Sequence, residues 1–445
     1  MAKKTKDSTL SIEAKLEQAL ISVWDEPYKL PENWCWVKIG SINNYVGHSV
    51  NPANTPSDKF ELYSVPSSDG DYPEIVLGNE IGSTKQSVEK EDVLLCKINP
   101  RINRVWKVSQ HTENTLLASS EWIIIRNKHI VSDYLMWCLR SPYFREFMLS
   151  NVSGVGGSLM RAQPKHVRNY PVPLPPFGEQ KRIAATIKDL FAKLDEAKEQ
   201  AQEVVEGFET RKAAILHKAF SGELTAKWRD ENGIDAASYN KRRFDEVAII
   251  KSNLVDPVEY QDYPHIAPDN IEKKTGVLLE YHTIAEDGVK SGKHRFYPGQ
   301  ILYSKIRPNL SKVVVIDFDG LCSADMYPIE AIGDTKCLWY YMLSENFLEQ
   351  ASSAGSRSVL PKINQKELSA LTVTIPDSIE EQKELSRLID SLLTKEYQVK
   401  ESAETVADQI DTMKKAILAR AFRGELGTND PTEENAKELL RKILK

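Results

Sequence analysis

The sequence lacks the features of a membrane, secreted or metal-knuckle protein. No run approaches about 18 uncharged apolar residues, so no membrane span is expected. The first residues are basic, but no apolar run of signal-peptide type follows them. The 5 cysteines stand singly without a Cys-x-x-Cys pair, so neither a disulfide framework nor a zinc knuckle is predicted. A reducing cytoplasm is the expected compartment.

The chain also lacks an excess of positive charge. Its 445 residues carry a formal net charge of −6, which argues only weakly against nucleic-acid binding. Net charge averages over all faces, whereas DNA binding needs only a local basic surface. The length fits two or three domains, and 41% hydrophobic with 27% charged residues is ordinary for a soluble globular protein.

A convincing active site is missing, although several segments imitate one. Leu174–Phe177 resembles an amino-methyltransferase tetrapeptide, but leucine replaces the hydrogen-bond acceptor that the reaction needs. Gly154–Gly157 lacks the strand–helix setting of a nucleotide loop, and Gly288–His294 is one residue short of a P-loop. Pro376–Asp377 with Glu381 imitates a nuclease signature, but these carboxylates are adjacent at a helix start, not on neighbouring strands. The 8 histidines show no zinc-binding spacing.

What the sequence does contain is a long-range repeat. Lys212–Leu224 reappears as Lys414–Leu426, with Ala-Ile-Leu, Ala-Phe and Gly-Glu-Leu in common. Glu179–Lys181 and Glu381–Lys383 recur at the same offset, so the two repeated segments are equal in length. A repeat of fixed length predicts two matched units joined by matched spacers. Such a design suits a protein that measures the distance between two targets.

Each repeated segment is predicted to form one long helix, the first over Glu179–Phe220. Apolar residues recur at alternating steps of four and three, the heptad seam of a coiled coil, and Arg211 and Glu396 interrupt it. Gly222 and Gly424 supply left-handed positions that end the helices. About 42 residues span roughly 60 Å. The predicted seam of the second helix comprises Leu385, Ile389, Leu392, Val399, Ala403, Val406, Ile410, Met413 and Ile417.

Neither helix can bury its seam alone, so an antiparallel pairing with a globular block at each end is predicted. Two unrelated helices, each packed on its own domain, remain the alternative. Short amphipathic helices near both termini are expected to pack together, to cap their own domains or to bind a partner; they cover residues 12–20 and 436–444.

The two globular blocks follow one plan of mixed α/β type. In each block a strand leads into a proline loop, and then come another strand, a short aromatic helix, a loop rich in glycine or serine, and a closing strand. The strands are predicted at 92–98, 104–108 and 172–175 in the first block and at 300–306, 312–316 and 373–376 in the second; the helices are at 134–139 and 338–343.

Basic residues cluster at equivalent loops of both blocks. Arginine and lysine bind phosphates or guanine edges, and asparagine reads adenine. Composition alone is equally consistent with solvated charges, but recurrence at equivalent places favours contact with DNA. The candidates are Lys97, Arg101, Arg104, Lys107, Arg161, Lys165, His166 and Arg168 in the first block and Lys305, Arg307, Lys312, Arg357, Lys362, Asn364 and Lys366 in the second.

Three motifs give the chain a resemblance to the specificity subunit of type I restriction-modification enzymes, which covers nearly its whole length. They are Leu30–Trp34, the Pro-Leu-Pro-Pro…Glu-Gln-Lys segment ending at Lys181, and the paired Ala-Ile-Leu…Ala-Phe-x-Gly-Glu-Leu endings. The second block departs from the pattern, because Phe244–Val247 stands where the first has its Leu-Pro-x-x-Trp start.

The resemblance implies an α/β (α+β) fold. Two mixed α/β target recognition domains in a pseudo-two-fold arrangement would be separated by two long antiparallel coiled-coil helices. The predicted segments are an N-terminal helical segment (1–28), the first recognition domain (29–178), a central helix and linker (179–239), the second recognition domain (240–378) and a C-terminal helix with a terminal amphipathic helix (379–445).

The resemblance also implies a function. Each recognition domain would read one half of a split sequence in double-stranded DNA, and the helices would set the gap between the halves. The chain itself would have no catalytic residues, metal or cofactor, and no membrane contact. Two methylation subunits would use S-adenosylmethionine, and restriction subunits would use ATP and Mg²⁺. The alternatives are a self-contained DNA methyltransferase or nuclease, and a coiled-coil scaffold that binds only proteins.

Overall fold

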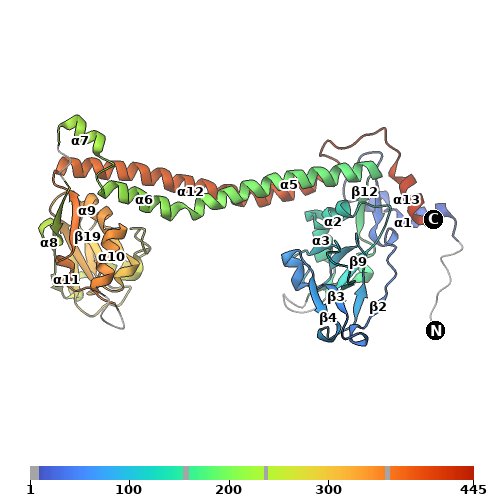
Figure 1. Cartoon of the computed structure of the whole chain (residues 1–445), viewed down its shortest axis with the longest axis horizontal. Helices are drawn as coiled ribbons and strands as arrows, with labels where there is room; N and C mark the ends of the chain where they lie inside the picture. Colours follow the sequence, from blue (N-terminus) through green and yellow to red (C-terminus); the bar gives the residue numbers. More distant parts are fainter. Residues whose placement is uncertain (1–9, 154–159, 235–238, 356–360) are drawn as a thin grey trace. The chain divides into compact units, whose positions relative to one another are not determined.

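The computed structural model describes residues 10–153, 160–234, 239–355 and 361–445. The chain forms two compact units: unit 1 comprises residues 1–200 and 406–445, and unit 2 comprises residues 201–405. Both units contain sheets, short helices and parts of two long helices (Figure 1). No helix in these described ranges is long and apolar enough to cross a membrane. Both globular blocks are mixed α/β domains, as predicted.

Unit 1 contains a five-stranded sheet of order β2-β5-β8-β3-β4 and a three-stranded sheet of order β7-β6-β9. Within the larger sheet, β3 runs parallel to β8, and β1 pairs separately with β12. The strands are β1 (Cys35–Lys38), β2 (Ser49–Val50), β3 (Lys59–Tyr63), β4 (Glu74–Leu77), β5 (Lys85–Ser87), β6 (Val93–Cys96), β7 (Val105–Lys107), β8 (Thr115–Ala118), β9 (Trp122–Ile125), β10 (Val152–Ser153), β11 (Arg161–Ala162) and β12 (Pro171–Leu174). The helices that belong wholly to this unit are α1 (Ile12–Ala19), α2 (Ser132–Arg140), α3 (Pro142–Ser150), α4 (Pro164–Val167) and α13 (Ala436–Leu444).

Unit 2 contains a five-stranded sheet of order β15-β18-β21-β16-β17 and a four-stranded sheet of order β14-β22-β19-β20. Here β16 runs parallel to β21, and β13 pairs separately with β23. The strands are β13 (Tyr239–Arg243), β14 (Ala248–Ile250), β15 (Leu254–Val255), β16 (Pro264–Ile266), β17 (His282–Thr283), β18 (Lys293–Phe296), β19 (Ile301–Ser304), β20 (Val313–Val315), β21 (Gly320–Cys322), β22 (Met326–Ala331) and β23 (Thr372–Pro376). The helices are α6 (Phe208–Phe220), α7 (Ala226–Asn232), α8 (Phe244–Val247), α9 (Thr335–Met342), α10 (Glu345–Ala354) and α11 (Gln365–Ser369).

The two units repeat one topology. Their five-stranded sheets have the same strand order in sequence, with one parallel pairing at the equivalent place. The predicted leading strands are β6 and β19, the strands after the proline loops are β7 and β20, and the closing strands are β12 and β23. The predicted aromatic helices are α2 and α9. The common plan inferred from the sequence is therefore confirmed.

The first long helix is not continuous, which corrects the prediction of one helix over Glu179–Phe220. It consists of α5 (Phe177–Glu206) and α6, separated at Gly207, whereas α12 (Ile379–Ala421) is a single helix of 43 residues. Gly207 has φ −74° and ψ −7°, so its ψ departs from the helical value. Glycine is among the weakest helix formers, which explains why the interruption falls there.

The polar residues that interrupt the predicted seam form a pair with each other. Arg211 Nε of α6 lies 2.6 Å from Glu396 Oε2 of α12. The same guanidinium donates to the Val204 carbonyl at 2.8 Å, one turn before the break at Gly207. A polar pair in a coiled-coil seam specifies the register of the two helices at some cost in stability. Arg211 and Glu396 thus fix which residues of α6 and α12 face each other.

Replacing Arg211 by alanine is expected to lower the free energy of unfolding by about 1 kcal/mol, since the pair is only partly exposed and the Val204 carbonyl loses its donor. Urea denaturation followed by circular dichroism measures this change. Lys395→Ala on the exposed face of α12 is the matched control. Equal loss of stability in both variants would contradict the register role.

The helices pair antiparallel within each unit. In unit 1, Lys198 Nζ lies 2.8 Å from Asp411 Oδ1, and Asp195, three residues earlier, pairs with Lys414, three residues later. In unit 2 the rings of Phe208 and Tyr397 are 4.9 Å apart, and Arg211 pairs with Glu396. In both units the residue numbers decrease along one helix as they increase along the other, so the helices run antiparallel.

Part of the predicted seam of α12 is exposed. Val399, Val406 and Met413 are 49%, 43% and 48% exposed, whereas Ala403 and Ile410 are buried. The exposed residues are spaced seven apart and form one heptad row; the buried ones form the other. Lys400, Ala407 and Lys414, one residue after each exposed position, are only partly exposed, so the second row of the seam lies there and the predicted positions Val399, Val406 and Met413 were wrong.

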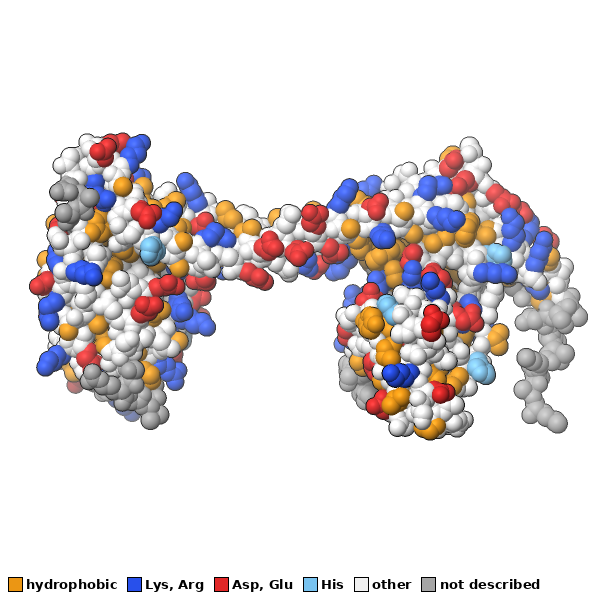
Figure 2. Space-filling view, viewed as in Figure 1, with side chains coloured by type: hydrophobic (Ala, Val, Ile, Leu, Met, Phe, Trp, Pro, Cys, Tyr) orange, Lys and Arg blue, Asp and Glu red, His pale blue; other side chains and the backbone are white. Residues whose placement is uncertain are grey.

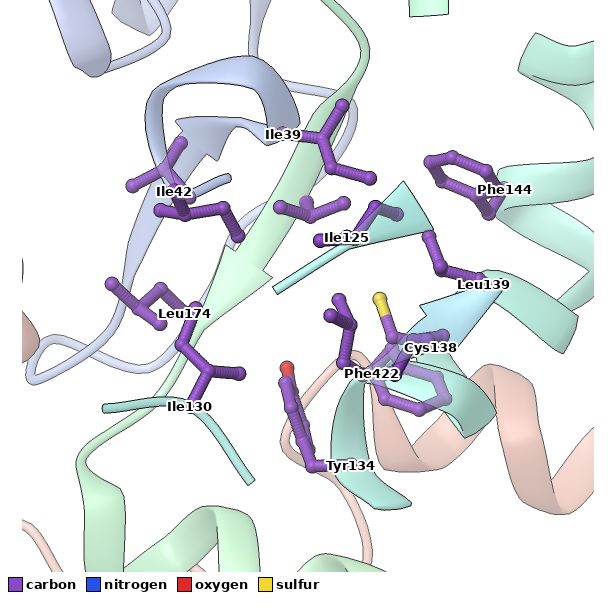
Figure 3. Packing of buried hydrophobic residues seen from close by; sticks show 14 of the residues in the cluster. Ile39, Ile42, Ile125, Ile130, Tyr134, Cys138, Leu139, Phe144, Leu174 and Phe422 are labelled. Carbon is purple, nitrogen blue, oxygen red and sulfur yellow. The ribbon is translucent and has the colours of Figure 1, made fainter. Parts of the chain in front are cut away.

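The repeated Ala-Phe endings anchor each helix to a globular block. Phe422, just after α12, is fully buried in the core of unit 1 and lies 5.5 Å from the ring of Tyr134. Figure 3 shows it beside Tyr134 and Cys138 of α2. In unit 2 the ring of Phe220 at the end of α6 lies 5.1 Å from that of Tyr341 on α9. The repeated sequence therefore determines where each helix packs on its globular block, as well as the length of the helix.

The repeated Glu-Gln-Lys starts also have a common role. Trp34 Nε1 donates to Glu179 at 2.7 Å in unit 1, and Arg229 donates to Glu381 at 2.7 Å in unit 2. Both glutamates are fully buried. The next residue, Gln180 or Gln382, accepts a backbone hydrogen bond from the block, at 2.9 or 2.8 Å. Each long helix therefore begins on its globular block through polar contacts that exclude water.

The terminal amphipathic helices α1 and α13 pack together in unit 1. Leu16 of α1 and Leu440 of α13 belong to the same buried cluster. Arg441 also lies 3.2 Å from Glu13. The expected mutual packing and the expected capping of their own domain are both observed, and binding to a partner stays a prediction.

Candidate nucleic-acid interface

In unit 1 the structure joins the two basic loops that the sequence singles out. The amide of Asn99 donates to the carbonyl of Met160 at 2.8 Å, and that of Ala162 donates to the carbonyl of Lys97 at 2.8 Å. Neither contact is visible in the sequence, because more than 60 residues separate the loops. The loops so joined are called the basic loop pair of unit 1, residues 97–104 and 160–168.

Unit 2 repeats this arrangement bond for bond. The amide of Arg307 donates to the carbonyl of Pro361 at 2.7 Å, and that of Ile363 donates to the carbonyl of Lys305 at 2.9 Å. These partners occupy the places of the four unit 1 residues just named. The basic loop pair of unit 2 comprises residues 305–312 and 361–366.

A lysine and a carboxylate support the loop pair of unit 1. Lys97 Nζ donates to the carbonyl of Ser120 at 2.6 Å. The next residue, Glu121, forms an ion pair of 3.1 Å with Arg161 of the second loop. Lys97 and Arg161 are therefore already engaged within the protein and hold the two loops against the start of β9.

The loop pair of unit 2 has the same support. Lys305 Nζ donates to the carbonyl of Ala324, and Asp325 pairs with Lys362 at 3.1 Å. Burial, and then the nearby charge of Lys362, lower the pKa of Lys305, whereas Asp325 acts in the opposite direction. Lys305 is thus a structural cation, held by the carbonyl and the carboxylate rather than freely presented to solvent.

The proline loop in each unit contains two residues with left-handed backbone four positions apart. Their φ angles are 46° at Asn99 and 55° at Asn103 in unit 1, and 48° at Arg307 and 43° at Ser311 in unit 2. Such conformations cost about 1–3 kcal/mol each for residues other than glycine and persist where the surroundings enforce them. The hydrogen bonds between the loops provide that enforcement.

Several predicted DNA-binding residues form ion pairs inside their own unit. Arg104 pairs with Asp69 at 2.8 Å, and Lys107 pairs with Asp133 at 2.6 Å. Lys312 donates to the Pro268 carbonyl at 2.7 Å. These cations have to exchange a partner before they bind a phosphate. Asn364 accepts from the amide of Glu367 at 2.9 Å as the N-cap of α11, and Arg357 lies outside the described residues.

Other predicted residues are available for binding. In the part of the chain that the structure describes, their side chains form no ion pair or hydrogen bond, and all but His166 are exposed. A phosphate can bind such a cation without breaking an existing ion pair. These residues are Arg101, Lys165, His166 and Arg168 in unit 1 and Arg307 and Lys366 in unit 2.

On the face that Figure 2 shows, Lys and Arg lie scattered among Asp and Glu over both units. This mixture agrees with the net charge of −6. Local clusters such as the basic loop pairs are therefore the candidates for contact with DNA.

The carboxylates of the nuclease-like segment serve the fold. Asp377 accepts from Asn240 at 2.7 Å, and the buried Glu381 accepts from Thr225 and Arg229 at 2.7 Å each. Ser378 Oγ accepts from the amide of Glu381 at 3.3 Å and caps the start of α12. The prediction that this segment caps a helix is confirmed.

Sequence reasoning missed one cationic feature of unit 2. Arg295 on β18 lies against the rings of Tyr260, Tyr263 and Tyr297. Tyr260 and Tyr263 lie more than 30 residues before Arg295 in the chain, so no short motif could have revealed the whole cluster. The only sequence signal is the density of tyrosine between residues 260 and 303.

Comparison with known proteins places these features in a family context. A family model described as the type I restriction modification DNA specificity domain matches residues 239–404, from β13 into α12. The type I restriction enzyme EcoDI specificity subunit of Escherichia coli is 32% identical over 420 residues, which cover 89% of this chain and 90% of that protein. The EcoKI specificity subunit of Escherichia coli K12 is 20% identical over 439 residues, with the same coverage of both chains, 89% and 90%.

Solved structures share the fold. The HsdS subunit from Thermoanaerobacter tengcongensis superposes with a TM-score of 0.67 at 20% identity, covering 90% of this chain and 100% of that one. A chain from a structure described as a study of complex assembly and conformational transition of the type I R-M system superposes with a TM-score of 0.68 over the same fractions.

Proposed function

Because this chain belongs to the family of type I restriction enzyme specificity subunits, we propose that each unit reads one half of a split DNA sequence. The observation that carries the proposal is the duplicated basic loop pair. The same backbone bonds and the same lysine–carboxylate support occur in both units, and each pair carries an exposed arginine without a partner among the described residues, Arg101 or Arg307.

The shared geometry suggests a division of tasks. The backbone framework of the loop pair is common to both units, whereas Arg101 and Arg307 stand at different positions in it, since Arg307 occupies the place of Asn99. A framework common to two readers of different sequences suits a target common to both half-sites. The phosphate backbone is such a target, and arginine binds phosphate in a bidentate manner. Arg101 and Arg307 would therefore position each unit on the duplex, while divergent parts of each unit read the bases.

The chain would act with partner subunits. Two methylation subunits that use S-adenosylmethionine would bind the long helices and methylate an adenine in each half, after flipping it from the duplex. Restriction subunits that use ATP and Mg²⁺ would complete the enzyme. The specificity subunit would supply no catalytic group, and the length of its helices would set the gap between the halves.

Sequencing of methylated bases in a host that expresses this chain with its methylation subunit tests the proposal. We expect N6-methyladenine in one motif made of two short specific halves with an unspecified gap. The double variant Arg101→Ala/Arg307→Ala is expected to reduce methylation at all sites in parallel, because phosphate contacts carry no sequence information.

The matched control is Arg243→Ala, an exposed arginine of unit 2 outside the long helices that pairs with Asp245. It should leave the motif and the extent of methylation unchanged. A contiguous motif would exclude two separate readers. Methylation by the purified chain alone would show a self-contained methyltransferase, and absence of any motif with an active methylation subunit would favour a protein-binding scaffold.

A further inference from the structure

Arg295 of unit 2 is held by aromatic rings. Its guanidinium carbon lies 4.9 Å from the centre of the Tyr297 ring, 5.3 Å from that of Tyr260 and 5.8 Å from that of Tyr263. Cation–π contacts at these distances stabilise a guanidinium and restrict its orientation. The three rings thus keep the Arg295 head group in a defined position.

The charge of Arg295 is not neutralised by a carboxylate. Across the residues that the structure describes, it forms no ion pair, in contrast to Arg104, Arg161 and Arg229. Its Nε is buried without a hydrogen-bond partner, and its Nη1 makes only a long contact of 3.5 Å to the Tyr260 hydroxyl. A guanidinium has five N–H donors, so the unused donors of the two terminal nitrogens, Nη1 and Nη2, remain for an acceptor outside the protein.

Arg295 belongs to a cross-strand row on one face of the five-stranded sheet. It pairs with Leu321, which is fully buried and pairs in turn with His265 on the far side. Residues paired across strands point to the same face. His265 Nδ1 lies 2.7 Å from Asp287, and its Nε2 is buried without a partner among the described residues. Two groups with unused hydrogen-bonding capacity therefore flank Leu321.

The aromatic surroundings of Arg295 reach the surface. Tyr297, whose ring lies against its guanidinium, is 41% exposed. Basic residues interleaved with aromatic and apolar ones are typical of surfaces that bind bases, because the rings and methyl groups contact base faces and the thymine methyl.

Unit 1 lacks this row although it has the same sheet. Leu117 is the counterpart of Leu321, and its cross-strand neighbours are Ser87 and Leu62. Leu62 and Leu117 belong to a buried apolar cluster in that unit. The arginine and histidine are thus specific to unit 2.

Each unit has a lysine at the equivalent place on this face of the sheet. Lys85 Nζ of unit 1 donates to Ser83 Oγ at 2.6 Å, and Lys293 Nζ of unit 2 donates to Ser291 Oγ at 2.7 Å. The framework of the sheet is therefore common, while the position of Arg295 differs. Such a difference is expected at a position that distinguishes one half-site from the other.

We propose that Arg295 reads a guanine in the half-site bound by unit 2, with its guanidinium donating to the O6 and N7 atoms of that base in the major groove. The inference rests on the proposed function. Arginine with guanine is the commonest specific contact between proteins and DNA, and it requires the guanidinium plane to be fixed. The tyrosine rings provide that fixation.

Methylation of an oligonucleotide panel by the complex of this chain with its methylation subunit tests the inference. The panel varies each base pair of the wild-type motif in turn. In Arg295→Gln and Arg295→Lys we expect discrimination at one guanine of one half-site to fall by about 5- to 150-fold, with the other half-site unchanged. Lysine keeps the charge but cannot bind both acceptors in the same plane.

The control is Arg243→Gln, an exposed arginine of the same unit that pairs with Asp245. It should leave discrimination at every position unchanged. Parallel loss at all positions in Arg295→Gln with full rescue by lysine would indicate a phosphate contact and overturn the inference. If Arg295→Gln fails to fold, as judged by thermal melting, the inference is tested by methylation of the same oligonucleotide panel with Arg295→Lys alone.

The test separates this inference from the proposed function. A wild-type complex that methylates a split motif, together with Arg295 variants that keep the full motif, would overturn only the assignment of Arg295. A wild-type complex without a split motif would overturn the proposed function itself.

Discussion

Replacing Phe422 by alanine is expected to lower the free energy of unfolding of unit 1 by about 3–5 kcal/mol. The side chain is 0% exposed and packs among residues of α2 and the sheets of that unit (Figure 3). Truncation leaves a cavity where the end of α12 meets the globular block. Denaturation followed by tryptophan fluorescence measures the change, because Trp34 and Trp36 are buried in the same unit.

Met413→Ala is the matched control for this prediction. Met413 lies two turns earlier on α12 and is 48% exposed, so its truncation should change the free energy by no more than about 0.5 kcal/mol. Similar shifts in the two variants would show that the end of α12 is not an anchor. A stable Phe422→Ala variant would in addition contradict the role assigned to the repeated Ala-Phe sequence.

Replacing Arg229 by methionine is expected to destabilise unit 2 by about 3–5 kcal/mol, because it removes the cation from the buried Glu381. The side chains of Arg229 and Glu381 are 9% and 0% exposed, and they lie 2.7 Å apart. The guanidinium also donates to the Gly222 carbonyl at 2.7 Å, where α6 ends. Thermal melting of the chain measures the loss.

A second substitution distinguishes charge burial from loss of packing. Arg229→Met combined with Glu381→Gln should recover much of the stability, since the uncompensated charge is then gone. Arg387→Ala serves as the exposed control and should not change the melting temperature measurably. A double variant as unstable as Arg229→Met would indicate that packing, rather than charge, explains the effect.

The sequence by itself determined the features that depend on neighbouring residues. The period of apolar residues identified the long helices, and Gly222 and Gly424, with φ of 84° and 75°, end them as predicted. Runs of apolar and β-branched residues beside proline loops located β6, β7, β19 and β20. The repeat revealed two matched units, and its motifs identified the family. Each of these signals can be read within a short stretch of the sequence or by direct comparison of one stretch with another.

The sequence misjudged features where two local preferences compete. It predicted one helix across Gly207, since the seam continues on both sides, but the weak helix propensity of glycine interrupts it. It treated Val406 as a seam residue, but the partly buried position there is Ala407, one residue later. The choice between these two neighbouring positions depends on the partner helix, which the local window does not contain.

Only the tertiary structure decided which distant side chains meet. It paired Arg211 with Glu396, which the sequence showed merely as two interruptions. It joined Asn99 to Met160, and it placed tyrosines from two segments around Arg295. Periodicity fixes the face of a helix or strand on which a residue lies, but not the residue opposite it. Those contacts form between residues far apart in the sequence, when long loops close. They depend on packing and charge between different helices and strands, not on the sequence within one helix or strand.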